Sequence, residues 1–205
     1  MKKVGLLLGS FDPIHIAHIN IAACVLNSGL CDKVLFVVAK HNPWKKNAPA
    51  SFDLRCKMVE LSIEPFGDKC EVCRLEENIE PPTYSYKVLT MIREQHPDDE
   101  LFIISGTDTF ERLPGWKNFE TDIKPYFKFI AIGRYIDPGH NLPEQGKAFR
   151  VTEIGCMLGQ VKEIVPLTMI ASSTVVRNMI KEGMNPTPYV TKEVLKIIND
   201  NNLYK

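Results

Sequence analysis

The chain has 205 residues, near the size at which one domain holds one hydrophobic core, so we expect a single domain over residues 1–205. Its 25 basic and 25 acidic side chains give zero net charge, which argues against nucleic acid or a membrane surface as a charge-driven partner. No apolar run approaches the ~20 residues that span a bilayer, and "VGLLLG" near the start is too short for a signal peptide, so we expect a cytoplasmic protein.

Strand-like and helix-like patterns alternate along the chain. A buried strand is predicted over residues 3–9, and a helix over 16–28, where apolar side chains recur at helical spacing. Residues 33–39 are apolar on both faces, as a central strand of a parallel sheet is. The next helix is predicted to start after Ser51, a favourable N-cap residue, and to end at Pro65. Its expected apolar stripe consists of Leu54, Met58 and Leu61.

The same alternation continues to the end of the chain. The remaining predicted elements are strands over residues 70–76, 100–106, 127–133 and 161–165, and helices over residues 83–96, 172–182 and 191–202. Strands that alternate with helices predict an α/β fold with a doubly wound, mostly parallel sheet and helices on both faces. Residues 134–149, rich in Pro, Gly and polar side chains, are predicted to form a surface loop rather than a domain boundary.

The six cysteines indicate neither a disulfide framework nor a zinc site. Cys70 and Cys73 form a C-x-x-C pair, but they lie in a predicted strand, whose alternation points the two thiols to opposite faces. No second C-x-x-C and no nearby H-x-x-H accompanies them at zinc spacing. We therefore expect reduced, structural cysteines and no metal held by the protein itself.

Residues that suit phosphate binding follow the predicted strands. Ligands of open α/β sheets bind beyond the carboxyl ends of the strands, so the side chains there matter most. Helix N-termini and exposed backbone N–H groups attract anions, and cationic side chains add to that attraction. The candidate residues are Gly9, Ser10, Phe11, Asp12, His15, His18, Lys45, Lys46, Gly106, Asp108, Ser172, Ser173, Thr174 and Arg177. Together they predict a polyphosphate site.

The pair His15 and His18 allows several interpretations from the residues alone. An H-x-x-H pair is often structural, and as a zinc pair it needs a further ligand that no spacing here offers. A general-base role needs a proton to remove. The spacing of three places both rings on one side of a helical turn, so that both can donate to one phosphate chain. Asp12 and Asp108 could orient ribose hydroxyls, bind a cation through water, or cap turns.

Two stretches far apart in the chain resemble the signatures of the nucleotidyltransferase superfamily of adenylyl- and cytidylyltransferases. "GSFDPIHIAH" resembles S/T-F-D-P-x-H-x-x-H, and "ASSTVVR" resembles I-S-S-T-x-x-R with Ala171 for the usual Ile. The stretches "PPTYSYKVL", "LFIISGTDTFERLPGW" and "NNLY" are similar to those of nicotinate and nicotinamide mononucleotide adenylyltransferases, although Ser105 and Thr107 depart from the usual Ile and Ala. The resemblance covers essentially the whole chain and implies a Rossmann-like nucleotidyltransferase fold.

The resemblance implies transfer of AMP from ATP to the 5′-phosphate of nicotinate or nicotinamide mononucleotide, with release of pyrophosphate, in NAD biosynthesis. It also implies Mg²⁺ bound mainly by the substrate and water. The implied catalytic residues are His15, His18, Arg177, Lys45 and Lys46, either lysine contacting phosphate. The implied ATP-binding residues are Gly9, Ser10, Phe11, Gly106, Asp108, Ser172, Ser173 and Thr174. The implied mononucleotide-binding residues are Asp12, Thr83, Tyr84, Ser85 and Trp116.

Other functions remain open at this point. Another member of the superfamily, such as a pantetheine-phosphate adenylyltransferase, usually has a shorter chain and lacks the Leu-Pro-x-Trp stretch. A non-catalytic nucleotide sensor is disfavoured because the phosphate-binding side chains are present. A zinc-binding module would use His15, His18 and the cysteines. The sequence decides neither the choice between nicotinate and nicotinamide nor the assembly state, so a homo-oligomer stays open.

Overall fold

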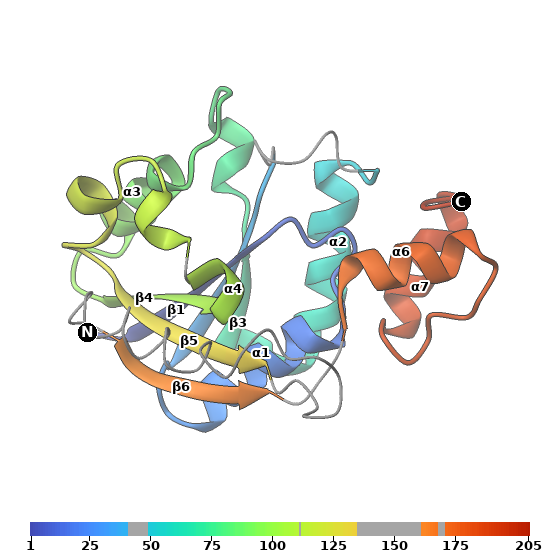
Figure 1. The fold of residues 1–205 in the computed structure, drawn as a ribbon, viewed down its shortest axis with the longest axis horizontal. Helices are drawn as coiled ribbons and strands as arrows, with labels where there is room; N and C mark the ends of the chain where they lie inside the picture. Colours follow the sequence, from blue (N-terminus) through green and yellow to red (C-terminus); the bar gives the residue numbers. More distant parts are fainter. Residues whose placement is uncertain (41–48, 111, 135–160, 168–170) are drawn as a thin grey trace.

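The computed structural model describes residues 1–40, 49–110, 112–134, 161–167 and 171–205. Six parallel strands form a sheet in the order β3-β2-β1-β4-β5-β6. The strands are β1 (Lys3–Gly9), β2 (Lys33–Val38), β3 (Cys70–Cys73), β4 (Glu100–Gly106), β5 (Lys128–Arg134) and β6 (Val161–Leu167). The predicted parallel sheet is confirmed, and it runs through the middle of the molecule in Figure 1.

Helices cover both faces of this sheet, which confirms the doubly wound α/β prediction. The described helices are α1 (Ile16–Asn27), α2 (Phe52–Ile63), α3 (Ser85–Gln95), α4 (Thr107–Phe110), α6 (Ser173–Lys181) and α7 (Lys192–Asp200). Side chains of α1, α2, α6 and α7 join the core on one face, and those of α3 and α4 join the core on the other. Figure 1 shows α2, α6 and α7 on one side and α3 on the other. None of the helices in the described segments is long and apolar enough to cross a membrane.

The buried face of helix α2 overlaps the predicted one only in part. Ser51 caps the helix as expected, because its hydroxyl accepts the N–H of Leu54 at 3.3 Å. Of the predicted stripe of Leu54, Met58 and Leu61, Met58 is fully buried and Leu54 packs half-buried against the core, whereas Leu61 is only half-buried. The buried residues are Arg55, Cys56, Met58, Val59, Ser62 and Ile63. Apolar periodicity missed part of this face because a charged side chain and a hydroxyl point inward, where both bond to backbone carbonyl groups.

The two cysteines of β3 point to opposite faces of the sheet, as predicted. Cys70 packs in the core that contains Phe36, and Cys73 packs in the core that contains Val88. Both are free thiols, as are Cys24, Cys31 and Cys56. Cys156 lies outside the described residues. The C-x-x-C spacing therefore reflects strand packing and not a redox or metal pair.

We expect Cys56 and Cys70 to be unreactive while the protein is folded. Burial raises the pKa of each thiol to about 11, so almost none of either is thiolate near pH 8. Alkylation with iodoacetamide followed by peptide mass spectrometry should leave both unmodified, whereas concentrated guanidinium chloride should expose both. The half-buried Cys24 is the internal comparison, and equal native rates at Cys24 and Cys70 would contradict this expectation.

The strand order reverses at β1, which has β2 on one side and β4 on the other. Leu7 of β1 stands opposite Phe36 of β2 and Ile104 of β4. The chain leaves β1 toward α1 and leaves β4 toward α4, which belong to opposite faces of the sheet. Such a divergence opens a crevice at the carboxyl ends of the two strands. The fold thus places the turns after Gly9 and Gly106 next to one another.

Candidate active site

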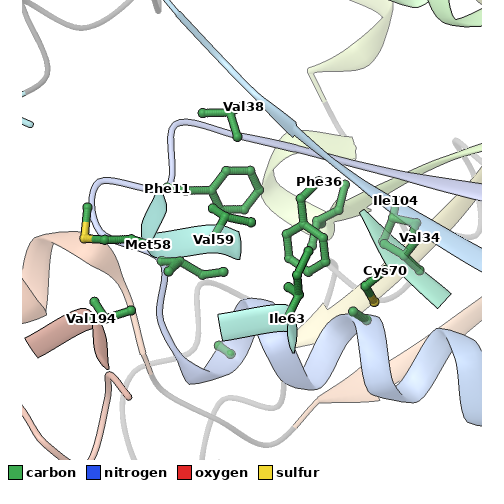
Figure 2. Packing of buried hydrophobic residues seen from close by; sticks show 14 of the residues in the cluster. Phe11, Val34, Phe36, Val38, Met58, Val59, Ile63, Cys70, Ile104 and Val194 are labelled. Atoms are coloured by element: carbon green, nitrogen blue, oxygen red, sulfur yellow. The ribbon is translucent and has the colours of Figure 1, made fainter. Parts of the chain in front are cut away.

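The turn after β1 is held in shape by Phe11. This residue has a left-handed φ of 48° and is only 2% exposed, with its ring in the core beside Val59 and Phe36 (Figure 2). A Cβ on Gly9 would stand 2.9 Å from the ring, so the close contact requires glycine there. The Phe11 side chain therefore anchors the turn in the core, and only its backbone can face a ligand.

His15 and His18 lie together at the start of α1, as their spacing predicts. Their rings stack with centroids 3.7 Å apart. The backbone N–H of His15 donates to Nδ1 of His18 at 3.3 Å, which leaves the ring proton of a neutral His18 on Nε2. His15 is buried, and His18 is half-buried. His18 therefore presents more surface than His15, with Nε2 as a hydrogen-bond donor, which is the form that a phosphate oxygen needs.

The two signature segments contact each other directly. Ser173, the first residue of α6, donates from its hydroxyl to the carbonyl oxygen of Pro13 at 2.9 Å. Arg177, one turn later, donates from Nη1 to the carbonyl oxygen of Asp12 at 2.7 Å. Its Nη2 reaches the Thr174 hydroxyl at 3.1 Å. Stretches more than 150 residues apart in sequence thus form one structure, with the N-terminus of α6 docked on the histidine turn.

The N-terminus of α6 has the features of an anion site. Ser172 caps it, since its hydroxyl accepts the N–H of Val175 at 3.2 Å. Ser172 and Ser173 are half-buried and Thr174 is exposed, so part of this first turn faces solvent. Backbone N–H groups in the first turn of a helix lack intrahelical partners and carry partial positive charge. The turn therefore suits the terminal phosphates of a nucleotide.

Two residues that were not predicted to belong to the site, the half-buried Tyr204 and the buried Arg55, complete this turn. The carboxylate of Asp12, itself 5% exposed, accepts the hydroxyl of Tyr204 at 2.6 Å and the N–H of Ala50 at 3.4 Å. The guanidinium of Arg55 donates to the carbonyl oxygen of Ser10 at 2.6 Å. The ending "NNLY" was a signal for Tyr204, because it resembles the family's last motif. No sequence periodicity marked Arg55.

The residues predicted to bind the mononucleotide ring lie on the α3 side of the sheet. Thr83 is buried, Tyr84 is the N-cap residue of α3, and Ser85 is its first helical residue. Trp116 packs half-buried against the core of that face. The next residue, Lys117, places Nζ 4.5 Å from the centre of the Tyr84 ring. The two segments of the predicted pyridine pocket are therefore neighbours.

Some predicted site residues cannot be placed by their side chains. Lys45 and Lys46 lie outside the described residues, and so do residues 135–149 of the predicted surface loop. Gly106 ends β4, as predicted. Asp108 lies in the short helix α4, described through its backbone alone. The phosphate roles of these residues stay predictions.

A metal ion held by the described segments themselves would need several ligating side chains close together. Within these segments, no group of three or more His, Cys, Asp or Glu side chains could hold a metal ion. One oxygen of the Asp12 carboxylate accepts from Tyr204 and Ala50. Mg²⁺ commonly keeps several waters and binds phosphate oxygens with few protein ligands. Its presence here belongs to the proposal below.

Comparison with known proteins decides the family. Residues 6–179 match the family model described as "Cytidylyltransferase-like". The chain belongs to the cytidylyltransferase-like family. Relatives of this cytidylyltransferase-like chain include a Flavobacterium johnsoniae protein, 31% identical over 99% of each chain. Another, from Thermus thermophilus, is 34% identical over 99% of this chain and 100% of the relative, and both are named "Probable nicotinate-nucleotide adenylyltransferase".

The solved structures agree on the fold of this cytidylyltransferase-like chain. The nicotinic acid mononucleotide adenylyltransferase of Plasmodium falciparum complexed with NaAD superposes with a TM-score of 0.77. The match covers 100% of this chain and 98% of that one at 20% sequence identity. The Rossmann-like nucleotidyltransferase fold and the superfamily predicted from the two signatures are both confirmed.

Proposed function

We propose that this chain is a nicotinate-nucleotide adenylyltransferase of NAD biosynthesis, which transfers AMP from ATP to the 5′-phosphate of nicotinate mononucleotide. The observation that carries the proposal is the contact of Ser173 and Arg177 with the carbonyl groups of Pro13 and Asp12. This contact places Arg177 and the N-terminus of α6 next to the turn that carries the two stacked imidazoles. Full-length relatives at 31% and 34% identity bear the name of this activity.

The reaction needs alignment and charge stabilisation more than a base. An oxygen of the mononucleotide phosphate forms a bond to the α-phosphorus of ATP while the bond to the bridging oxygen breaks, and pyrophosphate leaves. The acceptor phosphate is already anionic, so no side chain has to remove a proton. The protein lowers the barrier by holding both phosphates in line and by donating to the developing negative charge. Mg²⁺ bound mainly by the substrate and water would neutralise part of the phosphate charge.

The phosphate donors come from both signature segments and the lysine segment. His18 donates from Nε2 to the transferred phosphate, with His15 stacked beside it. Arg177 and the first turn of α6 bind the phosphates that leave as pyrophosphate. Either Lys45 or Lys46 adds a cation from the segment after β2. The backbone of residues 9–11 and of residues 106–108 holds the adenosine.

The mononucleotide lies on the other side of the crevice. Thr83, Tyr84 and Ser85 line the pyridine pocket, and Trp116 stacks on the ring. The Lys117 ammonium beside Tyr84 favours the anionic nicotinate over the neutral nicotinamide. We propose that residues 1–205 act as one domain in the cytoplasm, with these two nucleotides, and neither nucleic acid nor membrane, as partners.

The proposal is tested by offering one acceptor at a time. Purified protein receives ATP and Mg²⁺ with nicotinate mononucleotide, nicotinamide mononucleotide or phosphopantetheine, and pyrophosphate release is followed. We expect the highest kcat/KM with nicotinate mononucleotide and stoichiometric formation of the dinucleotide. A preference for phosphopantetheine would assign the chain to another branch of the superfamily. Binding of ATP without turnover on any acceptor would favour a nucleotide sensor.

A further inference from the structure

A buried guanidinium lies directly behind the histidine turn. Arg55 of α2 is 1% exposed. Its Nη1 donates to the carbonyl oxygens of Ser10 and Ala39, at 2.6 Å each, its Nη2 to that of Lys40 at 3.3 Å, and its Nε to that of Ala50 at 3.2 Å. Four backbone carbonyls therefore converge on one side chain. No carboxylate pairs with it among these hydrogen bonds.

These carbonyls belong to three segments that are separate in sequence. Ser10 follows β1, Ala39 and Lys40 follow β2, and Ala50 precedes the cap of α2. Arg55 thus ties the signature turn to the end of β2 and to the start of α2. Ala50 contacts the turn as well, because its carbonyl accepts from Arg55 while its N–H donates to the Asp12 carboxylate.

The C-terminal end of the chain closes on the same turn. The hydroxyl of Tyr204 donates to Oδ1 of Asp12 at 2.6 Å, across 192 positions of sequence. Arg177 holds the carbonyl oxygen of Asp12 at the same time. Asp12 therefore accepts hydrogen bonds at both its carboxylate and its backbone carbonyl. Its neighbours are also held, since Phe11 packs in the core and the carbonyl oxygen of Pro13 accepts the Ser173 hydroxyl of α6.

Burying these charged groups lowers the free energy of unfolding relative to apolar side chains of similar size. Removing a guanidinium and a carboxylate from water is unfavourable, and good hydrogen bonds offset this only in part. Burial is the leading cause that lowers the pKa of Arg55, and burial also leads in raising the pKa of Tyr204. Fully bonded buried networks do, however, define one backbone geometry more sharply than apolar contacts do. The geometry defined here is that of residues 10–13, immediately before His15.

We propose that Arg55 and Tyr204 are positioning residues of adenylyl transfer, which hold the turn of residues 10–13 so that His15 and His18 meet the reacting phosphates. The inference rests on the proposed function and deepens it. It assigns the chain's last motif a role in the site without contact to substrate. It also assigns Asp12 to the support of the turn, through Tyr204 and Ala50, in place of direct mononucleotide binding.

The main test is Tyr204→Phe, which removes one hydroxyl and keeps the ring. We expect kcat at saturating ATP and nicotinate mononucleotide to fall about tenfold, since a lost hydrogen bond to a charged group is worth this order. The KM for ATP should change little, because Tyr204 does not touch the nucleotide. Ile198→Val is the matched control, since it loosens the buried face of neighbouring α7 without altering the polar contacts.

Two results would overturn the inference. One is a Tyr204→Phe enzyme with the kcat of wild type. The other is an Ile198→Val enzyme that has the same thermal stability as Tyr204→Phe and loses as much kcat. Cooling the assay gives a further check, because a loss due only to unfolding disappears well below the melting temperature. Arg55→Lys keeps the charge but cannot reach four carbonyls, so we expect a larger fall in kcat together with lower stability. Absence of adenylyl transfer by wild type would instead overturn the proposed function.

Discussion

Replacing His18 with alanine should lower kcat by about 100- to 1,000-fold, the usual effect of removing one preorganised donor to a transition state. His18 is half-buried at the start of α1, and its Nε2 carries the donor proton because Nδ1 accepts the N–H of His15. Steady-state kinetics with ATP and nicotinate mononucleotide measure the change. Circular dichroism and thermal melting should show a folded protein, since little core volume is lost.

Two further substitutions at His18 separate its donor role from its role within the helix turn. His18→Asn keeps an acceptor near Nδ1 for the His15 N–H but has no donor at the Nε2 position, so it should be as slow as alanine. His18→Gln places an amide N–H near Nε2 and should recover part of the activity. His96→Ala serves as control, because His96 pairs with Asp99 just before β4 begins, at the opposite end of the sheet. Near-normal turnover of His18→Ala would refute the assignment.

Replacing Arg177 with alanine should reduce kcat/KM for ATP by roughly 10- to 100-fold, the order expected for a lost charged hydrogen-bond donor. Its guanidinium lies between Asp12 and Thr174, where the histidine turn meets α6. The effect should fall on ATP more than on the acceptor, because the first turn of α6 is the proposed site of the leaving phosphates. Calorimetry with a non-hydrolysable ATP analogue gives the binding part of the loss.

The controls for Arg177 use the same helix. Lys181→Ala removes a positive charge from the last turn of α6, on an exposed side chain, and should leave the kinetics unchanged. Arg177→Lys keeps the charge without the planar fork and should fall between wild type and alanine. Equal KM and kcat values for Arg177→Ala and wild type would count against a phosphate role and would leave docking of α6 as its function.

The elements were predictable where local signals were strong. Strands β1 and β4 begin and end at their predicted residues, because each is a largely apolar run that starts at a charged residue and ends at a glycine. Ser51 and Ser172 cap α2 and α6 as predicted, since a serine before a helical pattern satisfies free N–H groups. The buried face of α2 was predicted only in part, because apolar periodicity treats arginine as a surface residue and Arg55 points inward.

The candidate site was predictable only as a set of motifs. Both signatures could be found in the sequence, and their resemblance to a known superfamily led to the family that the comparisons confirm. The roles of individual residues remain predictions, including those of Lys45 and Lys46. Nothing local to Asp12 indicated that its carboxylate bonds to Tyr204, because the two residues are 192 positions apart and meet only after α7 packs beside α2.

The sequence by itself determined the alternation of strands and helices, the helix caps and the two signature motifs, because each depends on residues within a few positions of one another. Tertiary structure alone decided that α6 docks on the histidine turn, that the Phe11 side chain lies in the core, and that Arg55 donates hydrogen bonds to four backbone carbonyls. The physical reason is that buried polar groups must find partners, and those partners come from whichever distant segments the packed sheet and helices bring within hydrogen-bond distance.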